Sequence, residues 1–359
     1  MTSLHEGRGR MLKRMFKHCL VMVGVLLAGA LGGGAAHAAS GKLEIYWSDA
    51  EGGASTLIVT PAGQSLLVDT GSRGPDDRDP KRIFAAAQAA GLSKIDMVLI
   101  THFHGDHVGG LAALQKMIPV GMYLDHGETV EISRPNVNEA YNAYVALTAG
   151  KRRILKAGDR IPLDGVEIDV VMAAGQALAK ARPGAGEFNP ACADHKERNP
   201  EVDPDNDQSV GIALKYGKFD FVDLGDLTVN YEQKMVCPTN FVGRVDLFQV
   251  SHHGLDRSNS PQLVWAFQPT VAVMNNGPRK GGPPSVFETL RKSPGLQDIW
   301  QGHLALGTPA NVNTDEKMIA NLEPSETCKG SMLKASVDAQ GRFTVTNLRN
   351  GFSKTYESK

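Results

Sequence analysis

The sequence lacks an excess of either charge. Its 359 residues include 38 lysines and arginines and 39 aspartates and glutamates, which gives a formal net charge of −1. Proteins that bind the phosphate backbone of nucleic acids usually carry a clear basic surplus. The composition therefore gives no strong signal for a nucleic-acid partner, and a small-molecule or anionic substrate is the expected partner.

Long apolar runs are also missing from most of the chain. One glycine-rich apolar stretch, from Cys19 to about Leu31, is shorter than the roughly 20 residues that a membrane-spanning helix needs. It follows a basic run and precedes Ala36-His37-Ala38, an order typical of a secretory signal peptide. We therefore expect residues 1–38 to be a cleaved signal peptide, and the mature protein to be periplasmic or secreted without a transmembrane domain. The alternative is a single membrane anchor.

Cysteine is scarce, with four in the whole chain. The three that follow the expected leader are Cys192, Cys237 and Cys328, and no two of them have C-x-x-C spacing. This spacing argues against a cysteine-based metal site. In an oxidising compartment one disulfide can form and leave one thiol over, but the sequence does not say which pair forms.

Alternating and β-branched runs predict that strands dominate the chain, with helices between them. The main expected strands are 43–47, 56–60, 65–69, 95–100, 161–171, 209–215, 219–224, 245–250, 270–274, 333–337 and 342–347. The expected helices are 81–90, 108–117 and 284–291. We expect residues 39–359 to form a single domain, with a polar insertion around 182–207, interpreted as an active-site flap, and a C-terminal extension from about 276.

The most informative segment is the heptad 101–107, Thr-His-Phe-His-Gly-Asp-His. It follows an apolar strand and precedes a predicted helix, so its side chains can converge at a strand end. Imidazoles and a carboxylate are ligands that suit Zn²⁺. Two later segments also place such ligands after apolar strands: Gly225-Asp226, and Ser251-His252-His253-Gly254.

The H-x-H-x-D-H string resembles the signature of the metallo-β-lactamase superfamily. The later Gly-Asp and Ser-His-His-Gly motifs are most similar to the soluble hydrolase part of the ComEC/Rec2 group, over most of residues 42–275. The resemblance implies an α/β fold, a four-layer αββα sandwich with two Zn²⁺ ions at one edge. In this family the first two histidines bind one metal, which here implies His102 and His104. The second metal would be bound by Asp106 and His107, and Asp226 would bridge the two.

A further histidine is expected on the second metal. We favour His252 because it comes first after the strand, with His253 facing the substrate, although the reverse order stays open. Many family members add a third histidine to the first metal, about twenty residues before the bridging aspartate, and this chain has none there. Asp207, His195 or water are the alternatives. A weakened first metal would leave the site partly loaded or would favour Mn²⁺.

Together these features predict an exported metal-dependent hydrolase in which two zinc ions generate a hydroxide. Asp226 would hold this nucleophile, and Asp106 would orient it and move its proton. The resemblance favours a phosphoester, phosphodiesters included. Hydrolysis of a β-lactam or a lactone is the alternative, and a non-catalytic binding protein on the same fold is a further one.

Four other features are open to two interpretations. Asp69 is either a turn former or an acceptor for a ligand imidazole. His126 and His303 are candidate substrate contacts, although a hydrogen-bonded structural histidine is the more ordinary interpretation. The loop 275–282 carries two cations, Arg279 and Lys280, and either holds an anionic group or is a solvated turn.

Overall fold

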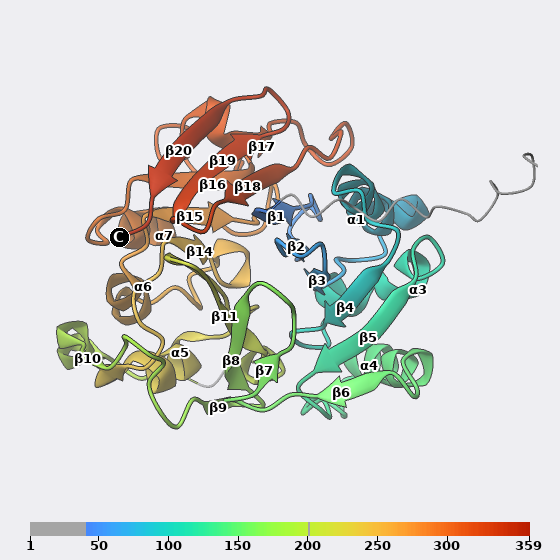
Figure 1. Cartoon of the computed structure of the whole chain (residues 1–359), viewed down its shortest axis with the longest axis horizontal. Coiled ribbons are helices and arrows are strands. Elements are labelled where there is room, and N and C mark those ends of the chain that lie inside the picture. Colours follow the sequence, from blue (N-terminus) through green and yellow to red (C-terminus); the bar gives the residue numbers. More distant parts are fainter. Residues whose placement is uncertain (1–40, 200–201) are drawn as a thin grey trace, which may run out of the picture. The chain divides into compact units, whose positions relative to one another are not determined.

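Two β-sheets pack against each other in the computed structural model, which describes residues 41–199 and 202–359 (Figure 1). The first sheet has the strand order β20-β19-β18-β1-β2-β3-β4-β5-β6, parallel from β3 to β6 and antiparallel elsewhere. Its strands are β1 (Leu43–Trp47), β2 (Thr56–Val59), β3 (Ser65–Val68), β4 (Ile95–Leu99), β5 (Val120–Asp125), β6 (Arg152–Ile154), β18 (Leu333–Val337), β19 (Arg342–Asn347) and β20 (Ser353–Glu357).

The second sheet has the order β17-β16-β15-β14-β12-β11-β8-β7, with β9 paired to β8. It is parallel from β12 to β17. Its strands are β7 (Arg160–Ile161), β8 (Glu167–Ala173), β9 (Gln176–Ala177), β11 (Gly211–Tyr216), β12 (Phe219–Asp223), β14 (Leu247–Gln249), β15 (Val271–Met274), β16 (Asp298–His303) and β17 (Ile319–Asn321). The C-terminal residues thus complete both sheets: β15 to β17 extend the second, and β18 to β20 extend the first.

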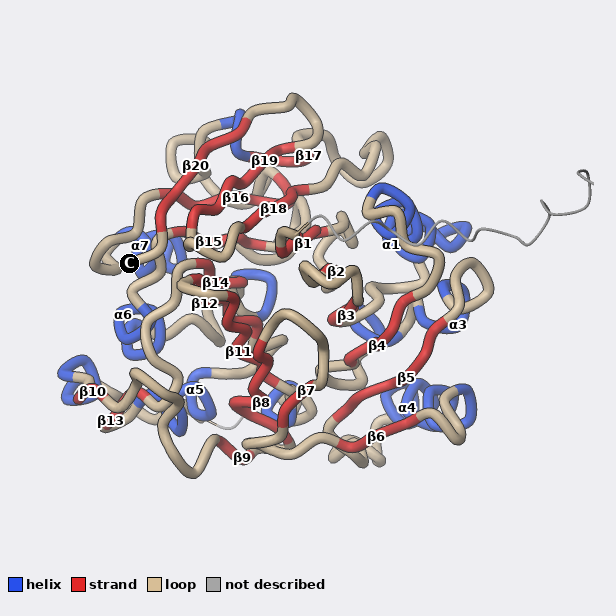
Figure 2. Tube along the Cα trace, in the orientation of Figure 1, coloured by secondary structure: helices blue, strands red, loops and turns tan. Residues whose placement is uncertain are grey.

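Strand alternation divides the buried side chains into three layers. Residues such as Ile45 and Val68 of the first sheet and Phe221 of the second pack between the sheets. Tyr46 and Leu67 point the other way, into a layer covered by helices α1 (Arg78–Ala89), α3 (Leu111–Leu114) and α4 (Pro135–Leu147). The outer face of the second sheet is covered by α5 (Val229–Val236), α6 (Pro261–Phe267) and α7 (Pro284–Arg291). The predicted αββα sandwich is confirmed, and Figure 2 shows its strands between the helices.

The helix expected at 108–117 is instead two short helices, α2 (Gly105–Val108) and α3. Gly109 and Gly110 separate them, and a Cβ at Gly110 would lie 2.1 Å from Thr70 O. This close approach of two backbones requires glycine and ends the helix. The expected signal peptide lies outside the described residues. Among the helices of the described part, none has the length and hydropathy needed to cross a membrane.

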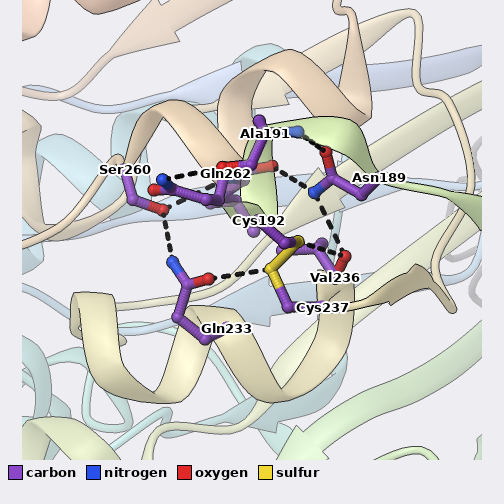
Figure 3. Close-up of a disulfide and its surroundings, with 9 residues drawn as sticks. Asn189, Ala191, Cys192, Gln233, Val236, Cys237, Ser260 and Gln262 are labelled. Atoms are coloured by element: carbon purple, nitrogen blue, oxygen red, sulfur yellow. Dashed lines mark hydrogen bonds between the residues drawn. A yellow bond between two sulfur atoms is a disulfide. The ribbon is translucent and has the colours of Figure 1, made fainter. Parts of the chain in front are cut away.

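The polar stretch 182–207 is fastened to the second helical layer by a disulfide between Cys192 and Cys237 (Figure 3). The Cα atoms of the two cysteines are 5.7 Å apart, and Cys328 keeps a free thiol. Asn189 Nδ2 adds hydrogen bonds to Val236 O and Gln262 O. The short elements of the polar stretch are β10 (Glu187–Phe188), which pairs with β13 (Thr239–Asn240), and the 3₁₀ turns Pro190–Asp194 and Asn206–Gln208. The remaining 3₁₀ turns are Pro75–Asp77, His252–Gly254 and Glu316–Met318.

Candidate metal centre

Strands of both sheets end beside one another and deliver the predicted ligands to one site. The heptad follows β4, Asp226 follows β12, and His252 and His253 follow β14. His252 and His253 have φ of 55° and 54°, a left-handed conformation that is uncommon outside glycine. Such backbone strain is tolerated where the surrounding structure fixes it, and it occurs preferentially at functional sites.

Four of these side chains, which we call the quartet, bring one ligand atom each within 4.8 Å of one another: Asp106, His107, Asp226 and His253. Asp226 Oδ2 lies 3.2 Å from Nε2 of both His107 and His253. Asp106 Oδ2 lies 3.3 Å from His253 Nε2. His252 is beside the quartet, with its Nε2 3.4 Å from Asp226 Oδ2.

His102 and His104 form a second, adjacent pair. His102 Nε2 lies 2.9 Å from His104 Nδ1, so these two nitrogens face each other. The ring centroids of His102 and His107 are 4.0 Å apart, which connects the pair to the quartet. Six predicted ligands of the two metals are therefore gathered in one place, together with His253.

The buried charges of the quartet favour a cation. Burial would raise the pKa of Asp226, but His107, His253 and His252 hold it well below its usual range. His107 and His253 do the same for the pKa of Asp106. Burial would lower the pKa of His107, but the carboxylates of Asp226, Asp69 and Asp106 outweigh it and raise that pKa well above its usual value. A site that stabilises positive charge so strongly suits a divalent metal ion.

The donor atoms fit such an ion. The Nε2 atoms of His107 and His253 are fully buried and form no hydrogen bond, although each lies close to a carboxylate. Buried polar atoms are rarely left unpaired in native proteins, and binding of an ion is one accepted explanation. Imidazole and carboxylate donors are the set that zinc and similar metals prefer. The described residues thus form a His/Asp metal site.

A second layer of polar residues orients the ligands. Asp69 Oδ2 lies 2.7 Å from His107 Nδ1, and Thr101 donates to both Asp69 oxygens. Of the two interpretations of Asp69, the structure therefore shows the acceptor. Glu131, which the sequence analysis did not identify, lies 3.1 Å from His104 Nε2.

Asp205 was also not identified from the sequence, and its hydrogen bonds connect the polar stretch to the heptad. Its carboxylate accepts from Phe103 N at 2.8 Å and from Thr129 Oγ1 at 2.7 Å, and its backbone N–H donates to Glu131. The signal was too weak to detect, because single acidic residues in polar segments are common and their partners are distant in sequence.

The other candidates lie apart from the quartet. Asp207 accepts a hydrogen bond from Thr228 Oγ1. His126 is 4% exposed, with its Nε2 3.6 Å from Asp205 Oδ2, so it is poorly placed to reach a substrate. His303 is buried and lies 2.6 Å from Asp49 Oδ1. Among the described residues, none of Asp207, His126 and His195 belongs to a group of three or more candidate ligands whose atoms lie within 4.8 Å of one another.

The chain is similar to several known proteins. Residues 49–176 match the family model of the Metallo-beta-lactamase superfamily. The chain is 26% identical to Recombination protein 2 of Haemophilus influenzae over 245 residues. This alignment covers 67% of this chain and 25% of that protein. A UPF0173 metal-dependent hydrolase of Cupriavidus metallidurans is 41% identical over 76 residues, 21% of this chain and 24% of that protein.

Among solved structures, the metallo-beta-lactamase fold protein YhfI of Bacillus subtilis aligns with a TM-score of 0.44 and 11% identity, covering 72% of this chain and 96% of that one. The chain spans about a quarter of the length of the first curated relatives that it matches. The part of the chain that matches the metallo-β-lactamase superfamily, residues 49–176, carries the H-x-H-x-D-H motif, and the described residues bring its ligands together with Asp226 and His253.

Proposed function

We propose that the protein is an exported metal-dependent hydrolase that uses two zinc ions to cleave phosphoesters, phosphodiesters included. The observation that carries the proposal is the position of Asp226. Its Oδ2 atom lies 3.2 Å from Nε2 of both His107 and His253, and the ring centroid of His107 is 4.0 Å from that of His102. A buried carboxylate among several imidazoles is suited to bridge two metals. Manganese is the alternative metal.

Two divalent ions in such a site would lower the pKa of water and polarise the bond that is cleaved. The chain's own residues would do the positioning. Asp69 fixes the ring of His107 so that Nε2 faces the quartet. Asp106 is the quartet's solvent-facing member, with 27% of its side chain exposed. Its Oδ2 is the atom that would accept the proton of the attacking water.

The bond is assigned to the phosphoester class because of the ComEC/Rec2-like motifs and the extended match to Recombination protein 2. A carboxyl-type bond is the second candidate, including β-lactams and lactones. A match of 42% identity over 62 residues to a hydroxyacylglutathione hydrolase of Xanthomonas axonopodis favours it. If the site proves metal-free and inert, a binding protein on the same fold is the remaining interpretation.

Export is supported by two features. The order of basic, apolar and small residues in 1–38 is typical of a secretory leader. The Cys192–Cys237 disulfide fits an oxidising compartment, where such bonds persist. Expression of the full chain should therefore give a mature protein that starts near residue 39 and is recovered outside the cytoplasm, as N-terminal sequencing of the fractionated protein would show.

The test of the hydrolase measures metal content by mass spectrometry together with activity on bis-p-nitrophenyl phosphate, nitrocefin and a lactone. About two metal ions per chain and cleavage of the phosphodiester are expected. Asp106→Ala should abolish the activity, whereas Asp315→Ala, which removes an exposed carboxylate elsewhere, should not. A metal-free wild-type protein that is inert on all three substrates would overturn the proposal.

A further inference from the structure

The loop that follows β15 places a lysine directly on the metal centre. Lys280 Nζ forms an ion pair with Asp106 Oδ2, although 174 residues separate the two in sequence. The side chain of Lys280 is 38% exposed and that of Asp106 is 27% exposed. The ion pair therefore lies where the metal centre meets solvent.

The backbone of the loop is held in place on both sides of this lysine. A Cβ at Gly281 would lie 1.8 Å from His253 O, and Gly281 has a φ of 81°, so only glycine fits there. Before the lysine, Gly277 N is bonded to Lys280 O across a tight turn, and Pro278 O accepts from Leu306 N. The fold thus fixes the backbone from which Lys280 reaches Asp106.

A surface pocket of about 180 Å³ adjoins this lysine. It is lined by Glu51, residues 278–280 and residues 324–326. Glu51 is engaged by two arginines, with Arg78 Nη1 2.7 Å from its Oε2 and Arg82 Nη1 3.0 Å from its Oε1. Its charge is largely compensated, so the charged groups that remain in the lining are the cations Arg279 and Lys280 and the carboxylate of Glu326.

The balance of charges around the metal centre favours an anionic ligand for Lys280. Asp106 is a ligand of the proposed metal centre, and its negative charge would then be shared with a divalent ion. Asp106 and Asp226 bring two negative charges against the four positive charges of two such ions. A partly desolvated ammonium group beside that excess of positive charge is stabilised by an anion. A phosphate oxygen meets this need, because lysine is a common point-charge ligand of phosphate.

We propose that Lys280, assisted by Arg279, is an anion subsite that binds a negatively charged oxygen of the substrate next to the scissile bond. The inference rests on the proposed hydrolase function and narrows its substrate class to anionic esters. A neutral ester would make no use of Lys280. Lys280 acts in substrate binding and specificity, whereas the quartet and the His102–His104 pair would bind the metals.

The test compares the metal-loaded wild type with Lys280→Gln and Lys280→Arg. Three quantities are measured: zinc content, the affinity for inorganic phosphate by calorimetric titration, and KM and kcat on bis-p-nitrophenyl phosphate and on neutral p-nitrophenyl acetate. Lys280→Gln should weaken phosphate binding and raise KM for the phosphodiester by about 10-fold or more, the usual effect of losing a charged hydrogen bond. The loss on the acetate ester should be much smaller than on the phosphodiester, because that ester offers Lys280 no negatively charged oxygen, and zinc content should not change. Lys280→Arg should restore most of the loss.

Lys292→Gln is the matched control, because Lys292 also pairs with a carboxylate, Glu288, but on the exposed end of α7. It should behave as the wild type. Equal losses on the anionic and neutral esters, a fall in zinc content, or unchanged phosphate affinity in Lys280→Gln would overturn the inference. A wild type that is inert on both esters would count against the hydrolase function instead, and phosphate titration would still decide the subsite.

Discussion

Asp69 Oδ2 lies 2.7 Å from Nδ1 of His107, and both side chains are almost fully buried. Asp69 is held in turn by the N–H and the hydroxyl of Thr101, at 2.8 and 2.7 Å. One strand end in the first sheet thereby fixes a ligand ring that faces Asp226 from the second sheet. The contact with Asp69 fixes the orientation of the His107 ring and leaves Nε2 as the nitrogen that faces the metal site.

Asp69→Asn should weaken metal binding about 10- to 100-fold, the range typical of lost second-layer carboxylates. Asparagine tolerates the left-handed φ of 61° at this position, so the turn is kept and only the charge and one acceptor are lost. Competition with a chromogenic chelator measures the zinc affinity. An unchanged affinity would show that Asp69 matters for the turn alone.

Glu131 should act in the same way on the other pair of histidines. Its Oε1 lies 3.1 Å from His104 Nε2, and Arg134 Nη1 lies 2.6 Å from its Oε2. Glu131→Gln keeps the size of the side chain but removes the charge that orients His104. We expect the metal-to-protein ratio after dialysis to fall from about two toward one, with Glu128→Gln in the same loop as the control. A ratio that stays near two would contradict this role.

The roles of His252 and His253 in metal binding can be distinguished by comparing their alanine variants. His253 Nε2 approaches both Asp106 and Asp226, whereas His252 Nε2 approaches Asp226 at 3.4 Å and its Nδ1 lies 3.1 Å from Ser258 Oγ. We therefore expect His253→Ala to lower the bound metal more than His252→Ala, measured by mass spectrometry under identical dialysis. The opposite order would support the assignment of His252 as the ligand that the sequence favoured.

Local sequence patterns were sufficient for most strands and for the heptad, because strand alternation and clustered ligands are properties of neighbouring residues. The αββα arrangement was expected only from the resemblance of the motifs to the metallo-β-lactamase superfamily. The strand Leu43–Trp47 and the helix Pro284–Arg291 begin and end where the sequence predicts. The contributions of Glu131, Asp205 and Lys280 depend on contacts with residues 27, 102 and 174 positions away. No periodicity or spacing encodes such contacts, so only the folded chain identifies Glu131 and Asp205. The sequence marks Lys280 as a loop cation, but only the folded chain places it beside Asp106.

The cysteine pair illustrates the same limit. The sequence alone leaves the pairing of Cys192, Cys237 and Cys328 open, since three cysteines without characteristic spacing give no preference. The structure pairs Cys192 with Cys237 because the polar stretch 182–207 packs along α5, where Asn189 Nδ2 bonds to Val236 O. Cys328 lies instead beside Asp49, with its Sγ 3.1 Å from Asp49 Oδ2.

Glu232 in α5 predicts a pH dependence of stability that is independent of the metal centre. Burial raises its pKa to about 7, although its carboxylate accepts from the N–H groups of Asn259 and Ser260 at 2.6 and 2.9 Å. A carboxyl group whose folded pKa exceeds its unfolded value of 4.5 binds more protons in the folded state. Its contribution to stability is therefore complete below about pH 4.5 and is lost as the pH rises through about 7.

Glu232→Gln removes this titration. The variant loses an acceptor for one of the two N–H groups, so it should be less stable than the wild type at pH 5. Between pH 5 and pH 8 the difference should shift in favour of the variant by roughly 2 to 3 kcal/mol, which is most of the free energy of a pKa difference of this size. Urea unfolding of the metal-free proteins at several pH values measures it. Glu288→Gln, on the exposed surface of α7, should show no such shift. A constant difference between wild type and Glu232→Gln across this range would mean that Glu232 stays ionised in the folded protein.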